Sequence, residues 1–295
     1  MASASGVVDP IWCPSGYKSF ELTTGHVYSA SQDETLSTAP ALQLTECISK
    51  CASNDACRAV NFETGLCVLF SSSANERPAG LTPSQFPVFT IYAQKVCLSS
   101  DARSRCDRLW TFERVVGYEL RKYSKRRLVA PTRTDCMDSC LLESEFSCRS
   151  FNYDSASGEC ILSDMDRHTL SGGPGSGSRT KEERHLLPAA NSTTDYFESN
   201  CVQEPNKLCD FKPTKGRILK TVDSVYQDVT TVEECKEKCI NSAYRCFSFD
   251  FGSDPQNSVC RTSHLDKASL THIEEPYLEV QGAVTYELSS CYNGK

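Results

Sequence analysis

Eighteen cysteines fall into three sets of six, and this repeat constrains the fold of the 295-residue chain more than any other feature. Each set has a long first gap, then C-x3-C, a short gap, a medium gap and a long gap before the sixth cysteine. The sets occupy positions 13, 47, 51, 57, 67 and 97; 106, 136, 140, 148, 160 and 201; and 209, 235, 239, 246, 260 and 291. A spacing that recurs three times predicts three copies of one structural unit, here called modules 1, 2 and 3.

The residues between the cysteines repeat as well. The fourth cysteine opens CRAVNF (57–62), CRSFNY (148–153) and CFSFDF (246–251), whose alternation in period two predicts a half-buried strand. All three modules read Y-x4-C before the sixth cysteine. After the fifth cysteine, Asp166 and Asp266 occupy equivalent positions, which suggests a turn or a salt bridge with the neighbouring Arg167 or Lys267.

The C-x3-C pair is typical of one face of a helix, because residues four apart lie one turn from each other. Thr132 with Asp135, and Thr231 with Glu234, have the spacing of an N-terminal capping box. Gln43 takes that place in module 1 and is a poorer cap. Each helix then presents two sulfurs toward the strands that follow, so the pair is expected to fasten a helix to a sheet.

The abundance of cysteine indicates an oxidising compartment. We therefore interpret the protein as extracellular, either secreted or the ectodomain of a membrane-anchored precursor. Zinc is the main alternative, but the chain has no C-x-x-C pair and only five histidines, so neither a metal nor another cofactor is expected. The N-terminal residues lack the apolar core of a secretory signal, and no apolar run reaches the roughly 18 residues of a membrane span. The sequence is expected to be a piece of a longer precursor.

A helix carrying C-x3-C, the strand pattern C-x-[AS]-[VF]-[ND]-[FY] and a terminal cysteine resemble the PAN/apple module, almost throughout the chain and three times over. The resemblance implies an α+β fold of three tandem disulfide-stapled PAN/apple modules, each a twisted antiparallel sheet cradling one helix. The module ranges are expected at 10–98, 104–202 and 207–293. A stretch rich in Gly, Ser and Pro at 171–195 is expected to be a flexible insertion in module 2.

The pairing of the cysteines follows from the same resemblance. Six cysteines allow many pairings and spacing alone does not select one, although nested pairing is geometrically economical. The PAN/apple resemblance implies the nested set. Its bridges would be Cys13–Cys97, Cys47–Cys67 and Cys51–Cys57; Cys106–Cys201, Cys136–Cys160 and Cys140–Cys148; and Cys209–Cys291, Cys235–Cys260 and Cys239–Cys246.

Modules 2 and 3 show a narrower likeness. The stretches FERVVGYELRKY, CRSFNYDSASGECILSDMDRHTL and CRTSHLDKASLTHIEEPYLEVQGAVTYELSSCYN look like invertebrate apical extracellular matrix proteins in which PAN modules precede a zona pellucida domain. The no-mechanoreceptor-potential-A family is the nearest of these. The likeness implies a cuticle or apical-matrix glycoprotein that links cells to matrix, with a polymerising zona pellucida domain after Cys291. Module 1 matches this pattern least well.

The sequence contains no catalytic constellation. Every cysteine has a place in the repeat, so none is left as a nucleophile and the protein is not expected to be an enzyme. His168 and His264 lie near each other in the repeat but not at equivalent positions. A surface or hydrogen-bonded role is the default for each of them. No Asp-x-Asp loop supports a calcium site beside Asp166 or Asp266.

The stretch RKYSKRR (121–127) is the candidate polyanion-binding site, with Arg121, Lys122, Lys125, Arg126 and Arg127 as its basic residues. As one strand it would place Arg121, Lys125 and Arg127 on one face, where they could bind sulfated glycan. The alternative is a solvated edge strand protected from aggregation by its charges. The formal net charge of −7 argues against nucleic acid as a partner.

Asn191-Ser-Thr, inside the expected insertion, is an acceptor sequence for an N-linked glycan. The alternative is a sequon that is not used.

These features favour an extracellular adhesion or matrix-linking region, in which tandem modules bind extracellular matrix or cell-surface proteins and their weak contacts add through multivalency. The alternative is a soluble heparin-, glycan- or protein-binding segment of a secreted protease or surface adhesin. Only the basic stretch at 121–127 supports the glycan interpretation. The linkers at 98–105 and 202–208 are short, so neighbouring modules should touch and form a semi-rigid rod. Contact with a membrane is expected only through segments outside this sequence.

Overall fold

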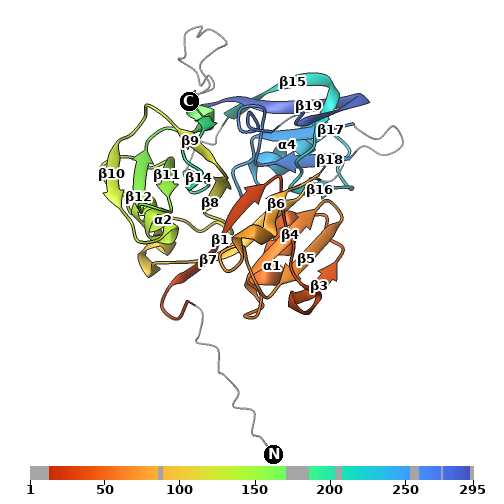
Figure 1. Cartoon of the computed structure of the whole chain (residues 1–295). Coiled ribbons are helices and arrows are strands. Elements are labelled where there is room, and N and C mark those ends of the chain that lie inside the picture. Colours follow the sequence, from red (N-terminus) through yellow and green to blue (C-terminus); the bar gives the residue numbers. More distant parts are fainter. Residues whose placement is uncertain are drawn as a thin grey trace, which may run out of the picture.

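The computed structural model describes residues 13–85, 89–170, 186–202, 208–252, 259–273 and 275–292, with only the backbone described at 170, 208–209 and 290–292. Figure 1 shows the three modules grouped around a common centre, module 1 in red to orange, module 2 in yellow to green and module 3 in cyan to blue.

The helices and strands follow the three sets of cysteines. Module 1 contains β1 (Tyr17–Thr24), β2 (His26–Tyr28), η1 (Gln32–Glu34), β3 (Thr35–Ala39), α1 (Leu44–Ala52), β4 (Ala59–Glu63), β5 (Leu66–Phe70), η2 (Pro78–Gly80), β6 (Leu81–Pro83) and β7 (Ile91–Leu98). After η3 (Ser100–Ser104), module 2 contains β8 (Phe112–Val115), β9 (Tyr118–Leu120), β10 (Arg126–Val129), α2 (Arg133–Leu141), β11 (Ser150–Asp154), β12 (Glu159–Ser163), α3 (Arg167–Leu170), β13 (Leu186–Pro188) and β14 (Thr194–Ser199). Module 3 contains β15 (Leu208–Leu219), β16 (Ser224–Tyr226), α4 (Val232–Ile240), β17 (Ser248–Phe251), β18 (Cys260–Ser263) and β19 (Tyr277–Tyr292).

The three modules share one strand order. It runs β1-β7-β4-β5-β3 in module 1, β8-β14-β11-β12-β10 in module 2 and β15-β19-β17-β18-β16 in module 3. Within each module, the strand that comes first along the chain pairs with the strand that comes last. The strand that follows the fourth cysteine lies at the centre of the sheet. All of these neighbouring strands pair antiparallel. The predicted α+β fold of sheet and single main helix per module is confirmed.

The main helix of each module is tied to its sheet as predicted. The Thr132 hydroxyl accepts a hydrogen bond from the Asp135 amide at 3.2 Å, and Thr231 accepts one from Glu234 at the same distance. Gln43 makes no such side-chain cap. The described side chains form eight of the nine predicted bridges: Cys13–Cys97, Cys47–Cys67, Cys51–Cys57, Cys106–Cys201, Cys136–Cys160, Cys140–Cys148, Cys235–Cys260 and Cys239–Cys246.

The ninth predicted bridge, Cys209–Cys291, involves side chains outside the described set. The backbones of the two residues face each other in the register of β15 and β19.

The strand after the fourth cysteine is buried on both faces, not on one. In β4, Val60 and Phe62 pack in a cluster with the bridged cysteines of α1, whereas Ala59 packs on the opposite side with Tyr28 and Tyr92. The second face is covered because β2 and the segments around it fold back over the sheet. The period-two pattern therefore separates two buried faces.

Module 3 departs from the other two in the register of its last strand. Asn61 faces Tyr92 and Asn152 faces Tyr196, but Tyr286 faces Phe249. The shift comes from an irregularity in the pairing of β15 with β19 at the positions of 210 and 211. The tyrosine of Y-x4-C is thus displaced by one position in module 3, although its sequence spacing is unchanged.

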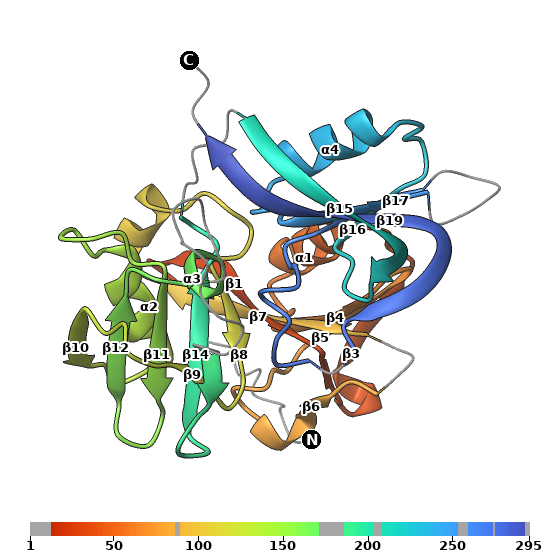
Figure 2. The ribbon, with the colours of Figure 1, turned by 90° about the horizontal axis from the view of Figure 1, so that it is seen from above.

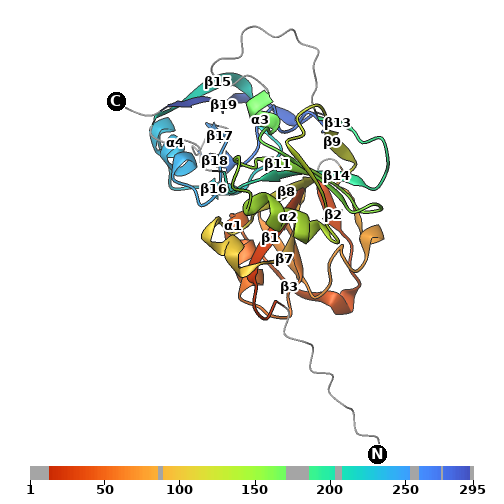
Figure 3. The ribbon, with the colours of Figure 1, turned by 90° about the vertical axis from the view of Figure 1, so that its left-hand side faces the viewer.

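The predicted semi-rigid rod is wrong, because the modules form a compact group. β1 of module 1 pairs in parallel with β8 of module 2, joining the two sheets into one of ten strands. Figure 3 shows module 1 below the other two modules, and Figure 2 shows module 3 closing over module 1 with its long curved β15 and β19. Two backbone hydrogen bonds join modules 3 and 1, from Leu44 N to Asp223 O at 2.6 Å and from Val225 N to Leu42 O at 2.9 Å.

The first linker is itself folded. Residues 100–104 form η3, and Ala102 is buried with Leu98 in the core of module 2. Asp138 of α2 accepts hydrogen bonds from the amide and hydroxyl of Ser99 at 3.0 Å. A linker that is packed in this way does not act as a hinge. The pairing of β1 with β8 confirms the prediction that modules 1 and 2 touch. Most of the second linker, residues 203–207, lies outside the described residues.

Candidate binding region at the junction of the three modules

All three modules meet around Trp110, which lies two residues before the start of β8. The indole stacks on the Tyr244 ring of module 3, with centroids 5.1 Å apart, and meets the edge of His264 at 5.7 Å. Trp110 and Tyr244 both belong to the core cluster that contains Leu44 and Ile48 of α1. Three modules that share one close-packed apolar core cannot shift relative to one another without exposing apolar surface to water.

A charged cluster crosses the boundary between modules 2 and 3, and Arg167 of α3 lies at its centre. The Arg167 side chain is only 2 % exposed, and its guanidinium donates to Glu198 at 2.8 Å and to Glu113 at 2.9 Å. A third hydrogen bond, 2.6 Å long, reaches the carbonyl of Ser269 in module 3. The arginine thus bridges two strands of its own module and a turn of the next.

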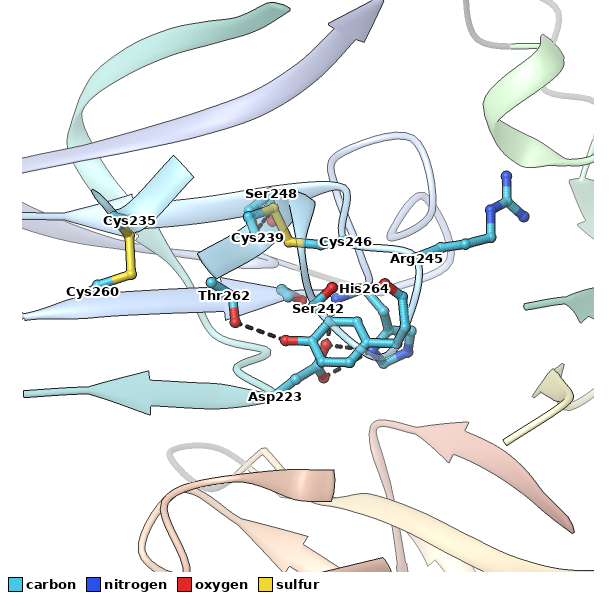
Figure 4. Close-up of a disulfide and its surroundings, with 12 residues drawn as sticks. Asp223, Cys235, Cys239, Ser242, Arg245, Cys246, Ser248, Cys260, Thr262 and His264 are labelled. Carbon is cyan, nitrogen blue, oxygen red and sulfur yellow. Dashed lines mark hydrogen bonds and ion pairs between the residues drawn. A yellow bond between two sulfur atoms is a disulfide. The ribbon is translucent and has the colours of Figure 1, made fainter. Parts of the chain in front are cut away.

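The two histidines singled out in the sequence belong to this cluster. His168 lies 3.3 Å from Glu198 and 3.3 Å from Asp266 of module 3, and its ring stacks on Phe247 with centroids 3.5 Å apart. His264 lies 2.8 Å from Asp223. Figure 4 shows the two side chains pointing toward each other. The hydrogen-bonded role expected for each histidine is confirmed.

His264 also connects the two modules, since it lies 3.6 Å from Glu113 of module 2. Glu113 in turn binds Arg167, so the two histidines are linked through one chain of opposite charges.

Arg245 of module 3 contacts module 2, just as Arg167 of module 2 contacts module 3. Its guanidinium donates to the carbonyl of Ser199 at 2.9 Å, and its backbone amide donates to Asn200 at 3.1 Å, both in module 2. It also lies 3.6 Å from Asp166. In Figure 4 the Arg245 side chain extends away from the disulfides of module 3, toward the green ribbon of module 2.

The repeated Asp166 and Asp266 serve both as turn residues and as partners across the boundary. Their carboxylates accept hydrogen bonds from the amides of Thr169 and Ser269, at 2.7 and 2.9 Å, which confirms the predicted turn. The predicted salt bridges with the next residue in sequence are wrong. Asp166 pairs instead with Arg149 and Arg245, and Asp266 pairs with His168.

The electrostatics of the cluster favour its charged forms. Burial alone would lower the pKa of His168, but the carboxylates of Asp266 and Glu198 outweigh burial and raise this pKa to about 10. Asp223 and Glu113 likewise raise the pKa of His264 to about 10. Burial opposes ionisation of Glu113, yet Arg167 and His264 lower its pKa to about 2. Both histidines are therefore cationic at neutral pH.

The sequence patterns singled out Asp166 and Asp266 but not Glu113, Glu198, Asp223 or Arg245. Glu113 and Glu198 each follow an aromatic residue in a strand, in WTFERV and YFES, and this signal was available in the sequence. A charge inside an apolar strand indicates a buried partner. Arg167 comes from α3, far along the chain from Glu113, and His264 comes from module 3, so the sequence pattern did not supply these partners.

The basic stretch at 121–127 is not one strand. β10 begins only at Arg126, because the chain bends at Lys122, which has a positive φ of 76°. Four of the basic residues pair with acids: Arg121 with Glu119, Lys125 with Asp164, Arg126 with Glu143 and Glu145, and Arg127 with Glu159. Lys122 also has an interaction partner. These ion pairs neutralise much of the charge on which glycan binding was predicted.

The expected flexible insertion is partly a strand. Residues 171–185 lie outside the described residues, but Leu186–Pro188 form β13 and pair with β9, with Leu186 buried. The prediction of a flexible stretch is therefore wrong for these three residues, and also for Thr194 and Asp195, which begin β14. Asn191 is exposed in the turn before β14, and its side-chain oxygen accepts a hydrogen bond from Thr194 at 2.6 Å. Its glycosylation stays a prediction.

Two absences among the described residues limit the kinds of site that they can form. No group of three or more His, Cys, Asp or Glu side chains is arranged there to hold a metal ion. Among the helices of the described ranges, none has the length and apolar character needed to span a membrane.

Comparison with protein families matches the PAN domain three times, at residues 13–97, 106–201 and 209–291. None of the curated proteins compared with this chain matches it. Similar solved structures include the two N-terminal apple domains of Toxoplasma gondii microneme protein 4, at 14% identity over 58% of this chain and 84% of that chain, with a TM-score of 0.20.

Toxoplasma gondii sporozoite AMA1 matches at 14% identity over 49% of this chain and 51% of that chain, with a TM-score of 0.19. The same protein in complex with a 36-residue region of sporozoite RON2 matches at 15% identity over 50% of each chain, with a TM-score of 0.19. The match therefore spans about half the length of the AMA1 chains.

The family matches begin and end at the first and sixth cysteine of each set, and together they cover most of the sequence. The chain belongs to the PAN domain family and consists of three tandem PAN domains.

Proposed function

We propose that the three PAN modules act together as one rigid, non-enzymatic binding unit for an extracellular protein. The observation that carries this proposal is the junction around Trp110 and Arg167, where an apolar core and a buried charge network hold the modules in fixed relation. Surfaces from different modules then form one preorganised site, which lowers the entropy lost on binding. The abundance of disulfides supports an extracellular location.

The narrower proposal is that this unit links cells to an extracellular matrix, as part of a cuticle or apical-matrix protein of the zona pellucida type. Its support is the likeness of modules 2 and 3 to the no-mechanoreceptor-potential-A family. A rigid unit suits such a role, because force on one end is transmitted through disulfides and paired strands, not through hinges.

Fractionation of the full-length protein from its own tissue tests this function. We expect recovery with detergent-insoluble extracellular matrix and release only by reduction or denaturant. A variant with Arg167→Met and Trp110→Ala, which loosens the junction without touching the outer surfaces, should lose retention. Recovery of the unaltered protein in soluble fluid would contradict the matrix-linking function.

A further inference from the structure

A pocket of about 660 Å³ opens where all three modules meet on the side of β2 and β9. Module 1 contributes Thr24, His26 and Phe89, module 2 contributes Val116 and Tyr118, and module 3 contributes His272 and Ile273, among others. Its volume lies within the range of roughly 300–1,000 Å³ typical of ligand pockets. Because three separate modules form its wall, the pocket exists only while they are docked.

The wall of the pocket is largely aromatic and aliphatic. The rings of Tyr118 and His272 meet edge to face, with centroids 5.5 Å apart. A side-chain carbon at Gly25 would lie 3.4 Å from both Phe89 and Ile273, so modules 1 and 3 approach each other closely there. Such a wall offers flat faces against which another ring can stack.

A few polar atoms of the same wall have no partner among the described residues. They are Oγ1 of Thr24, which is 3 % exposed, Oγ of Ser84 and Nδ1 of His272. Buried polar atoms normally have hydrogen-bond partners, so each of these is available to a bound group. Burial lowers the pKa of His272 to about 4, so its imidazole is uncharged at neutral pH and can donate or accept.

Three charged side chains line the pocket, Arg114, Lys220 and Glu275. Arg114 pairs with Asp195 at 2.6 Å and lies 3.9 Å from Glu21, and Lys220 also has an interaction partner. Aromatic and aliphatic walls beside a few polar groups resemble the centre of a protein interface, where a buried ring supplies most of the binding energy.

We propose that this pocket receives the aromatic side chain of a protein partner, a tyrosine or tryptophan whose polar edge hydrogen-bonds to His272. The proposal rests on the function proposed above and names the place of contact. The ring would stack against Tyr118, while its hydroxyl or indole N–H meets the unpartnered nitrogen of His272. A side chain without a polar edge would fill the same space with lower affinity.

Ligand-observed NMR titration of the full chain tests this chemistry, with N-acetyl-L-tyrosinamide, N-acetyl-L-tryptophanamide, N-acetyl-L-phenylalaninamide and N-acetyl-L-lysinamide as probes. We expect the first two to bind more tightly than the third, and the lysine probe not to bind. His272→Phe keeps the ring and its volume, so it should weaken the tyrosine probe about fivefold, as expected for one hydrogen bond, and leave the phenylalanine probe unchanged.

Tyr118→Ala removes a stacking surface and should weaken all the aromatic probes. The matched control is Tyr226→Ala, in the separate hollow beside α4, which should change none of them. Equal binding of the tyrosine probe to wild type and His272→Phe, or preference for the lysine probe, would overturn the proposal.

Retention of the protein on matrix distinguishes an error in the proposed pocket from an error in the proposed function. Val116→Trp fills the pocket, so loss of retention with a native thermal transition supports the proposal. Retention of both wild type and Val116→Trp would refute the pocket and leave the proposed function standing. If wild type itself is not retained, the proposed function fails, and the probe titrations alone decide whether the pocket accepts an aromatic ring.

Discussion

At the scale of single residues, one side chain in each module fastens the second strand to the centre of the sheet. Asn61 donates to the carbonyl of Tyr28 at 2.9 Å and accepts from its amide at 3.1 Å. Asn152 makes the same two bonds with Leu120, both at 2.9 Å. A side-chain amide suits this position because it donates and accepts along one edge.

Module 3 has Asp250 at this position, and the substitution predicts a pH-dependent weakness. Asp250 accepts from the Leu219 amide at 3.1 Å, but its other oxygen has no partner among the described residues. Burial raises the pKa of Asp250 to about 7, although the hydrogen bond from Leu219 and the charge of Arg261 oppose this shift. The protonated carboxyl can donate as an amide does, whereas the carboxylate cannot.

We expect Asp250→Asn to stabilise the protein above pH 7 and to have little effect near pH 4. The folded-state pKa lies above the unfolded value, so this group's contribution is fully present at low pH and declines as pH rises toward 7. The loss is on the order of 4 kcal/mol in the fully ionised state. Urea unfolding at pH 4 and pH 8 measures the difference.

The matched control is Asn152→Asp, which should introduce the same pH dependence into module 2. Equal unfolding free energies for wild type and Asp250→Asn at pH 8 would show that Asp250 is solvated or paired when ionised.

At the scale of elements, the three main helices differ in how they begin. The backbone of Gln43 is extended, with φ −130° and ψ 130°, close to that of Thr132 and Thr231. Glu46 already stands three residues later, so Gln43→Thr would complete a capping box without changing the backbone. The expected gain is about 1 kcal/mol.

A shift of the urea midpoint to higher concentration, with an unchanged slope, is the expected observation for Gln43→Thr. The reverse change, Thr132→Gln, should lower the stability by a similar amount because it removes an observed cap. Stabilisation by both changes, or by neither, would mean that contacts of position 43 with module 3 outweigh capping.

The sequence predicted the local elements of each module but not the contacts between distant strands. Helices, caps and the central strand depend on neighbours within a few residues, and Thr132, Thr231 and the C-x3-C pairs predicted them correctly. The displacement of Tyr286 depends on an irregular pairing between distant strands, which leaves no mark on the Y-x4-C spacing. Partners of Arg167 come from distant strands and another module, so local sequence suggested the wrong ion pair.

At the scale of the whole molecule, the charge network predicts how docking of modules 2 and 3 responds to alkali. His168 and His264 have folded-state pKa values of about 10, above the ordinary value of 6.5. Their contribution is fully present below about pH 6.5 and is lost as pH rises toward 10. Glu113 acts in the opposite sense, because its pKa of about 2 makes its contribution decline only below about pH 4.5.

Thermal unfolding at pH 7.5 and pH 9.5 tests the two histidines. Asp250 is already ionised over this range, and burial lowers the pKa of Lys95 to about 8, so Lys95 changes the stability in the opposite sense. We expect the wild-type transition to fall in temperature between these values. The double variant His168→Gln and His264→Gln should start lower and change less. His264 faces Asp223, Glu113 and Trp110, and His168 faces Glu198, Asp266 and Phe247. An equal fall in wild type and double variant would assign the alkaline loss to other groups.

The compact grouping of the modules is itself testable in solution. A single compact body of 295 residues should have a radius of gyration of about 19 Å, whereas three modules in a line would exceed this value clearly. Small-angle X-ray scattering of the full chain gives this radius directly. Arg167→Met combined with Trp110→Ala leaves buried carboxylates unpaired and empties the shared core, so the radius should increase while the disulfides keep each module folded.

An enlarged radius for wild type would mean that the modules separate in solution, and neither a composite surface nor a pocket between them would then persist. A compact wild type with an expanded double variant would attribute the grouping to the junction around Trp110 and Arg167. Because β1 and β8 join modules 1 and 2 through backbone pairing, the expansion should come from module 3 moving away. Loss of matrix retention in the same double variant would then connect the binding activity to the position of module 3.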